Sequence, residues 1–144
     1  MNPRRILVAL LVLCAGLTAR AQYQNGSVVT VLPGGTNNVA ATATNTLTSD
    51  IVVNRSNGVG IFVSAKALAA HTGTVIFVFK RGVDSAAIEN YETFRVALTC
   101  AGTATVNLYT NLTLGHEQFI RLAAVENVTG VAVTNVTVKA AIKR

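Results

Sequence analysis

The chain of 144 residues contains no tryptophan, one methionine, two prolines and two cysteines, and only 12% of its residues are charged. Soluble domains usually carry about 25% charged residues. Because 51% of the residues are nonetheless hydrophobic, the chain is not of the disordered class, which is rich in charge and poor in aliphatic side chains. Its length suits one domain. The hydrophobic residues are mostly Val, Ala, Leu and Ile, mixed with many Thr and Asn, a composition that favours pleated sheet over helix.

Cysteine is too scarce for a disulfide framework. Cys14 lies in a segment that we expect to be removed, which leaves Cys100 alone in the mature chain. Cys100 follows Phe94, Val96 and Leu98 in an alternating apolar set, and this predicts that its thiol is buried. The sequence also lacks zinc-ligand spacing, an acidic calcium loop and a phosphate-binding glycine loop. We therefore expect neither a metal ion nor a cofactor.

The first 21 residues have the three zones of a secretory signal peptide. Two arginines form a positive head, residues 6–17 form an apolar run, and the sequence Ala-Arg-Ala at 19–21 has small residues where a signal peptidase reads. An apolar run of this length covers about 18 Å as a helix, short of the roughly 30 Å of a membrane's hydrocarbon core. We expect an N-terminal signal helix, cleavage between Ala21 and Gln22, and no membrane span in the mature chain. The mature protein would then be secreted, periplasmic or at the cell surface.

The positive charge is small once the signal peptide is removed. The formal net charge is +6, and three of the twelve basic residues lie in the first 21 positions, so the mature chain carries +3. The remaining excess lies in Lys139, Lys143 and Arg144 at the carboxyl end. Because nucleic-acid binding needs many clustered basic side chains, we expect no nucleic acid partner.

Alternation of apolar and polar residues recurs along almost the whole mature chain and predicts antiparallel strands. In residues 104–114, Val106 and Leu108 fall on one face, and Asn107 and Tyr109 fall on the other. By contrast, the run at 74–80 is apolar on both faces, as in a central strand that is covered twice. Further strands are expected near residues 27–32, 39–47, 50–55, 59–66, 93–100, 117–126 and 130–139.

The breaks between these strands carry turn residues. Asn57-Gly58 predicts a hairpin with a type I′ turn. In residues 130–139 the apolar positions change phase, which predicts a bulge near Thr134-Asn135. Two segments, 65–71 and 84–91, have the length of a helical turn, the second with Asp84 or the serine after it as its cap.

Turns about every ten residues, without a long amphipathic helix, predict an all-β fold. We expect a signal peptide at 1–21 and one antiparallel β-sandwich at 22–144, with about eight strands in a jelly-roll or immunoglobulin-like arrangement.

Candidate catalytic groups are few. His71, two residues before Gly73, and His116, directly after Gly115, both lie in expected turns, and no serine or cysteine stands in a nucleophile motif. Glu89 and Glu92 are close in sequence, but nothing places either in an apolar pocket that would raise its pKa. We expect the protein not to be an enzyme.

Charge is concentrated in residues 80–95, which include Arg81, Asp84, Tyr91 and Arg95. One interpretation is a binding loop in which an arginine engages a carboxylate and Tyr91 supplies a stiff contact area. The alternative is a connection that crosses between two sheets and is held by internal ion pairs.

A second candidate surface follows from the strand at 104–114. Tyr109 shares its face with Asn107 and Asn111, a polar row able to hydrogen-bond sugars or a neighbouring subunit. Asn111 also begins one of five Asn-x-Ser/Thr triplets, which are glycosylation acceptors in a eukaryotic secretory route. The strand pattern assigns all five phenylalanines to the core: Phe62, Phe77, Phe79, Phe94 and Phe119.

The sequence favours an exported, non-enzymatic β-sandwich that works through its surface as a structural, cell-envelope or assembly component. Uncharged Thr and Asn faces suit subunit contacts, because few charges need to lose water. We expect self-association, or an envelope or virion partner. A glycan- or ligand-binding module is one alternative, and a virion or prophage structural protein with an uncleaved amino terminus is another.

Overall fold

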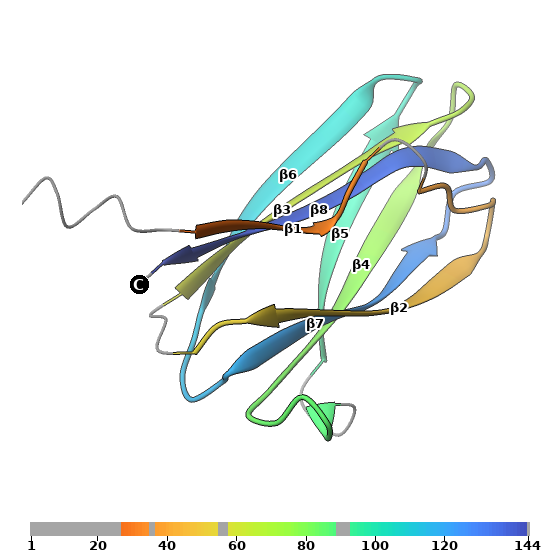
Figure 1. The fold of residues 1–144 in the computed structure, drawn as a ribbon. Helices are drawn as coiled ribbons and strands as arrows, with labels where there is room; N and C mark the ends of the chain where they lie inside the picture. Colours follow the sequence, from red (N-terminus) through yellow and green to blue (C-terminus); the bar gives the residue numbers. More distant parts are fainter. Residues whose placement is uncertain (1–26, 35–36, 55–57, 89–92, 144) are drawn as a thin grey trace, which may run out of the picture.

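The computed structural model describes residues 27–34, 37–54, 58–88 and 93–143. The expected signal helix and Tyr91 lie outside these residues. The described chain forms eight strands and no α-helix (Figure 1). The strands are β1 (Ser27–Leu32), β2 (Thr44–Val52), β3 (Gly58–Ala67), β4 (Thr72–Gly82), β5 (Thr93–Ala101), β6 (Thr105–Thr113), β7 (Phe119–Asn127) and β8 (Val133–Lys143).

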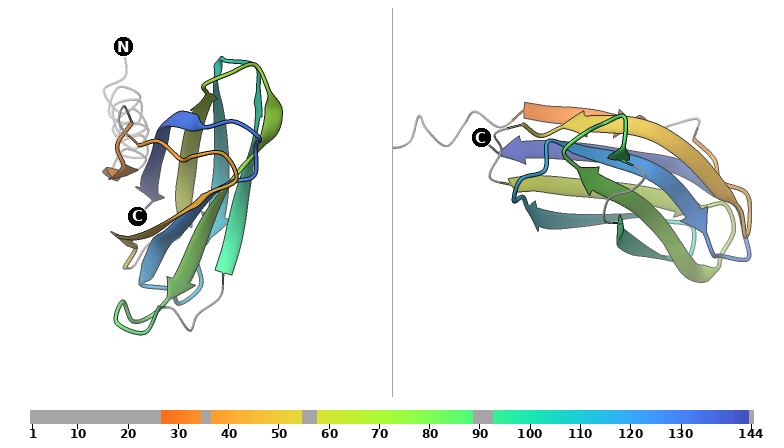
Figure 2. Two further views of the ribbon diagram at one scale, coloured as in Figure 1. Left: turned by 90° about the vertical axis from the view of Figure 1, so that its right-hand side faces the viewer. Right: turned by 90° about the horizontal axis from the view of Figure 1, so that it is seen from below.

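The strands form two antiparallel four-stranded sheets that pack face to face (Figure 2). Sheet A has the order β1-β8-β3-β6, and sheet B has the order β2-β7-β4-β5. Strand β4 pairs with β5, β3 with β6, β2 with β7 and β1 with β8, so the chain resembles one long hairpin wrapped into two layers. This order is that of a jelly roll, one of the two arrangements that the sequence predicted.

Several strand boundaries differ from the prediction. The expected strands at 39–47 and 50–55 are one strand, β2, and Val39 makes only an isolated bridge to Val133. The predicted hairpin at Asn57-Gly58 is wrong, because β2 and β3 lie in different sheets. The helical turn expected at 65–71 is also wrong, because its first three residues continue β3.

The bulge predicted in the last strand is confirmed. Strand β8 has an extra residue opposite Ala65 of β3, where the pairing register shifts. Asn135 there has a φ of 53°. As a result Val133 and Val136, three positions apart, are both fully buried in the core.

The inner faces of the two sheets form one apolar core. Phe77 and Phe79 are fully buried in it, and the ring of Phe79 stacks on that of Phe94 at a centroid distance of 5.1 Å. Cys100 is buried as predicted, and burial raises the pKa of its thiol. Phe62 and Phe119 are not core residues, because the isoleucines next to them in sequence point inward and the two rings lie on the outer faces.

Candidate binding surfaces

The charged segment at 80–95 joins two neighbouring strands of the same sheet, β4 and β5, instead of crossing between sheets. Arg81 Nη1 lies 3.3 Å from Oε1 of Glu117, and Arg95 Nη1 lies 3.0 Å from Oε2 of Glu126. Both arginines that were candidates for an external carboxylate therefore pair with a carboxylate of the chain itself. Asp84 caps the turn after β4, where its Oδ1 accepts the backbone N–H of Ala86 at 2.9 Å.

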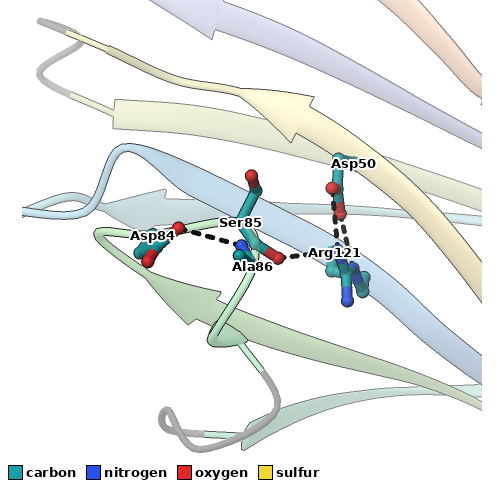
Figure 3. A network of polar contacts seen from close by, with 5 residues as sticks. All are labelled: Asp50, Asp84, Ser85, Ala86 and Arg121. Carbon is teal, nitrogen blue, oxygen red and sulfur yellow. Dashed lines mark hydrogen bonds and ion pairs between the residues drawn. The ribbon is translucent and has the colours of Figure 1, made fainter.

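Arg121 fastens this turn to the outer face of sheet B (Figure 3). Its guanidinium donates to both carboxylate oxygens of Asp50, at 2.6 and 2.9 Å, and to the carbonyl oxygen of Ser85 at 3.0 Å. Asp50 and Arg121 are directly opposite in the pairing of β2 with β7. Sequence reasoning missed Arg121 because this pairing joins residues that are far apart in the chain.

Glu117, in the connection between β6 and β7, has a side chain whose surroundings change its pKa. Partial burial opposes its ionisation, but the backbone N–H groups of Glu117 and Gly115 and the positive charge of Arg81 outweigh that effect. The pKa of Glu117 is therefore below its ordinary value of 4.5. The Gly115 N–H donates to its Oε2 at 2.5 Å.

The outer face of sheet A carries a row of three side chains from neighbouring strands. Lys139 of β8 lies opposite Phe62 of β3, and Phe62 lies opposite Tyr109 of β6. Directly opposite residues point to the same face of a sheet. Tyr109 is 57% exposed, and Asn107 and Asn111 on either side of it are exposed as well. The structure therefore keeps the predicted polar row and adds Phe62 and Lys139 to it.

The Tyr109 side chain crosses to the neighbouring strand. A methyl group at Gly60 of β3 would lie 2.6 Å from Cζ of Tyr109, which is closer than real contacts allow. Gly60 is buried under this side chain, although it belongs to the outer face. The absence of a side chain at Gly60 thus lets the tyrosine lie across β3 while more than half of it stays exposed. Sequence reasoning missed Gly60 and Phe62 because only the register of β3 with β6 brings them to Tyr109.

The strands of sheet A contain three lysines, Lys66, Lys139 and Lys143, and no acidic residue. Lys66 and Lys139 make no ion pair in the segments described. The arginines of sheet B, by contrast, pair with carboxylates of β2, β7 and the connection between β6 and β7. The outer face of sheet A is therefore positive.

Among the described strands, β1 pairs with β8 alone, so it forms a free edge of sheet A within this part of the chain. Its six residues carry no charge, and the first four are exposed, including Val28 at 69% and Val29 at 38%. Apart from its pairing with β8, no backbone hydrogen bond joins β1 to another segment within the part of the chain that is described.

Within the same described segments, no helix is long and apolar enough to cross a membrane. No group of three or more His, Cys, Asp or Glu side chains there is placed to hold a metal ion.

The sequence matches no protein-family model, and no curated protein is significantly similar to it. The fold is similar to a segment of tripeptidyl peptidase 2, with a TM-score of 0.54, 6% identity, and coverage of 83% of this chain and 10% of that chain. The VP2 subviral particle of infectious bursal disease virus gives a TM-score of 0.52 and 11% identity over 85% of this chain and 34% of that chain.

A carbohydrate-binding module from a family 9 glycoside hydrolase of Ruminococcus flavefaciens FD-1 gives a TM-score of 0.48 and 9% identity over 83% of this chain and 98% of that chain. The chain thus spans about a tenth of tripeptidyl peptidase 2 and a third of VP2. The two likenesses with a TM-score above 0.5 show the β-sandwich fold alone.

Proposed function

We propose that the protein is an exported, non-enzymatic β-sandwich that serves as a structural or assembly component, and that its copies associate through the edge of β1. The observation that carries this proposal is the free edge itself, with its exposed Val28 and Val29. Unprotected edge strands offer their N–H and C=O groups to another chain. Natural proteins protect such edges with lysine or proline, and β1 has neither.

A second copy fits this edge better than an unrelated strand does. Two β1 strands related by a twofold axis would pair antiparallel and join two copies of sheet A into one eight-stranded sheet. Because β1 is uncharged, no charged side chain would lose its hydration in the contact.

The ion pairs that the acidic side chains make with arginines support a role without catalysis. Asp50, Glu117 and Glu126 each hold an arginine. His71 lies in a turn, where its Nε2 accepts the N–H of Gly130 at 3.3 Å. A carboxylate whose oxygens already accept hydrogen bonds from an arginine is less available to take a proton from a substrate.

Sedimentation velocity over a concentration series tests the association. We expect the average mass to rise with concentration, and the Val28→Lys variant to need at least about tenfold more protein, because like charges would meet at the twofold axis. Val128→Lys is the matched control, since Val128 is 60% exposed outside β1. A protein that stays monomeric at millimolar concentration, or a Val28→Lys variant that assembles like the original, overturns the proposal.

Amino-terminal sequencing of the natural protein tests export separately. A mature start at Gln22 supports a secreted or envelope protein. An intact Met1 supports the virion or prophage alternative, in which the same edge would join subunits of a particle.

A further inference from the structure

We propose that the outer face of sheet A binds an acidic polysaccharide, with a sugar ring stacked on Tyr109 and sugar carboxylates held by Lys139 and Lys66. This site is separate from the β1 edge and does not depend on association of the protein. Its parts come from three strands of one sheet, β3, β6 and β8, so its geometry is fixed by the register of the sheet.

Tyr109 supplies the stacking surface. Its side chain is held across Gly60 and is still 57% exposed, so the ring is positioned before any ligand arrives. The face of an aromatic ring is electronegative and attracts the weakly positive C–H groups on the flat side of a sugar. Phe62 lies opposite Tyr109 in the next strand and extends the aromatic surface toward Lys139.

The charge of the face selects an anionic ligand. Lys139 lies two strands away from Tyr109, about 10 Å at the usual strand spacing, and Lys66 lies further along β3 on the same face. The four strands of sheet A carry no acidic residue that would repel a carboxylate or neutralise these lysines. A polymer with a carboxylate on each sugar can occupy the ring and both lysines together, which strengthens binding of the whole chain.

The polar groups beside the ring favour a sugar over a nucleic acid. Asn107 and Asn111 stand on either side of Tyr109 and offer amide donors and acceptors that match sugar hydroxyls. Single-stranded nucleic acids need a longer basic groove and several stacking side chains. Sheet A has no arginine and only three lysines.

Isothermal titration calorimetry with four probes tests the ligand class. The probes are polygalacturonate, neutral dextran, polyglutamate and oligo(dT), each at low salt with the full protein. We expect polygalacturonate to bind at least about tenfold more tightly than the other three, and added salt to weaken its binding because the lysines are screened. Dextran that binds as tightly as polygalacturonate overturns the proposal, because it would show that charge is not needed. Polyglutamate that binds as tightly also overturns it, because it would show that the sugar is not needed. Tighter binding of oligo(dT) also overturns it.

Variants test the geometry. Tyr109→Ala is expected to weaken polygalacturonate binding about tenfold and Lys139→Ala about threefold, whereas Tyr109→Phe keeps the ring and most of the affinity. Gly60→Ala displaces the ring and should weaken binding severalfold. Lys80→Ala removes a lysine of sheet B and is expected to change the affinity less than twofold.

Thermal unfolding of each variant separates loss of binding from loss of structure. Gly60→Ala should melt no lower than the original protein, because alanine suits a strand interior better than glycine does. Unchanged affinity in both Tyr109→Ala and Gly60→Ala, in folded proteins, would overturn the proposed site.

Discussion

Asn127 is the buried polar residue that joins three segments at one end of the sandwich. Its side chain is only 2% exposed. Its Nδ2 donates to the carbonyl oxygens of Val39, Ala40 and Val131 at 3.1, 2.9 and 2.9 Å, and its Oδ1 accepts the N–H of Thr129 at 3.0 Å. In the sequence it is merely the first residue of an Asn-x-Thr triplet. In the fold its amide nitrogen is already used, so it is not accessible to a glycosyl group.

Asn127→Ala should destabilise the protein by about 2 kcal/mol, because it leaves the N–H of Thr129 unpaired, removes one of the hydrogen bonds at each of three carbonyl oxygens and opens a small cavity. Urea unfolding monitored by circular dichroism measures this as a lower midpoint with an unchanged slope. Asn107→Ala, at an exposed position, is the control and should stay within about 0.5 kcal/mol of the original protein. If Asn127→Ala lowered the free energy of unfolding by less than about 0.5 kcal/mol, the hydrogen bonds of Asn127 would contribute little to stability.

Glu117 should make stability depend on pH in acid. Because its pKa is lower in the folded chain than the ordinary 4.5, its contribution is complete above that value and is lost as the pH falls through the folded pKa. Glu117→Gln should therefore lower the free energy of unfolding at pH 7 by a few tenths of a kcal/mol, since solvent partly screens the pair with Arg81.

Urea unfolding at pH 7 and pH 3 measures the difference between Glu117→Gln and the original protein. We expect the difference to shrink at pH 3. If the difference in the free energy of unfolding were the same at pH 7 and pH 3, the charge of the Glu117 carboxylate would not contribute to stability.

At the scale of single elements, the sequence predicts most where the information is local. The bulge in β8 can be predicted from the sequence because the apolar positions in residues 130–139 change phase. A strand can bury the apolar residues on both sides of such a change only if it contains one extra residue at that point. The burial of Cys100 follows from the same alternation in β5.

Prediction fails where register over long distances decides the outcome. Asn57-Gly58 has the local signature of a hairpin, yet the strand before it, β2, belongs to sheet B and the strand after it, β3, belongs to sheet A. Phe62 has a large apolar side chain, as core residues often do. Its neighbours Ile61 and Val63 point to the inner face, so Phe62 lies on the outer face. The partners of Tyr109 depend on the pairing of β3 with β6, which no short window of sequence contains.

The β8 bulge gives a prediction of its own at Asn135, whose φ is 53°. Asparagine tolerates this left-handed backbone, whereas a β-branched side chain is strained in it. We expect Asn135→Val to cost about 1–2 kcal/mol and Asn135→Gly to cost almost nothing, as measured by urea unfolding. Thr134→Val, next to it, is the control and should be nearly neutral. Equal stability of Asn135→Val and Asn135→Gly would contradict the strain argument.

At the scale of the molecule, the charges divide between the two sheets. The formal charge of the whole sequence is a sum over two different sheets. In sheet B the arginines pair with carboxylates, whereas the charged residues in the strands of sheet A are all lysines. This division is invisible in the sequence, because strands of the two sheets alternate irregularly along the chain. Although residues 22–138 carry as many acidic as basic side chains, the folded chain can therefore present one positive face to an anionic partner.

The nested pairing of the jelly roll also predicts the order of folding. The β4–β5 pair closes the shortest loop, and the β1–β8 pair joins the two ends of the described chain. Closing a long loop costs more entropy than closing a short one. The cost of joining the chain ends falls once the inner strand pairs have formed, because these pairs shorten the loop that remains to be closed. We therefore expect the transition state for folding to contain β4 and β5 largely paired, with β1 and β8 still open.

Stopped-flow folding of two core variants tests this order. Leu98→Ala in β5 should mainly slow folding, with a φ-value of about 0.5–0.8, whereas Ile142→Val in β8 should mainly speed unfolding, with a φ-value of about 0–0.3. Both side chains are buried, at 3% and 6% exposure, so both substitutions should lower stability measurably. If Ile142→Val slowed folding more than Leu98→Ala did, pairing of the chain ends would come first, and the entropy of loop closure would not set the order.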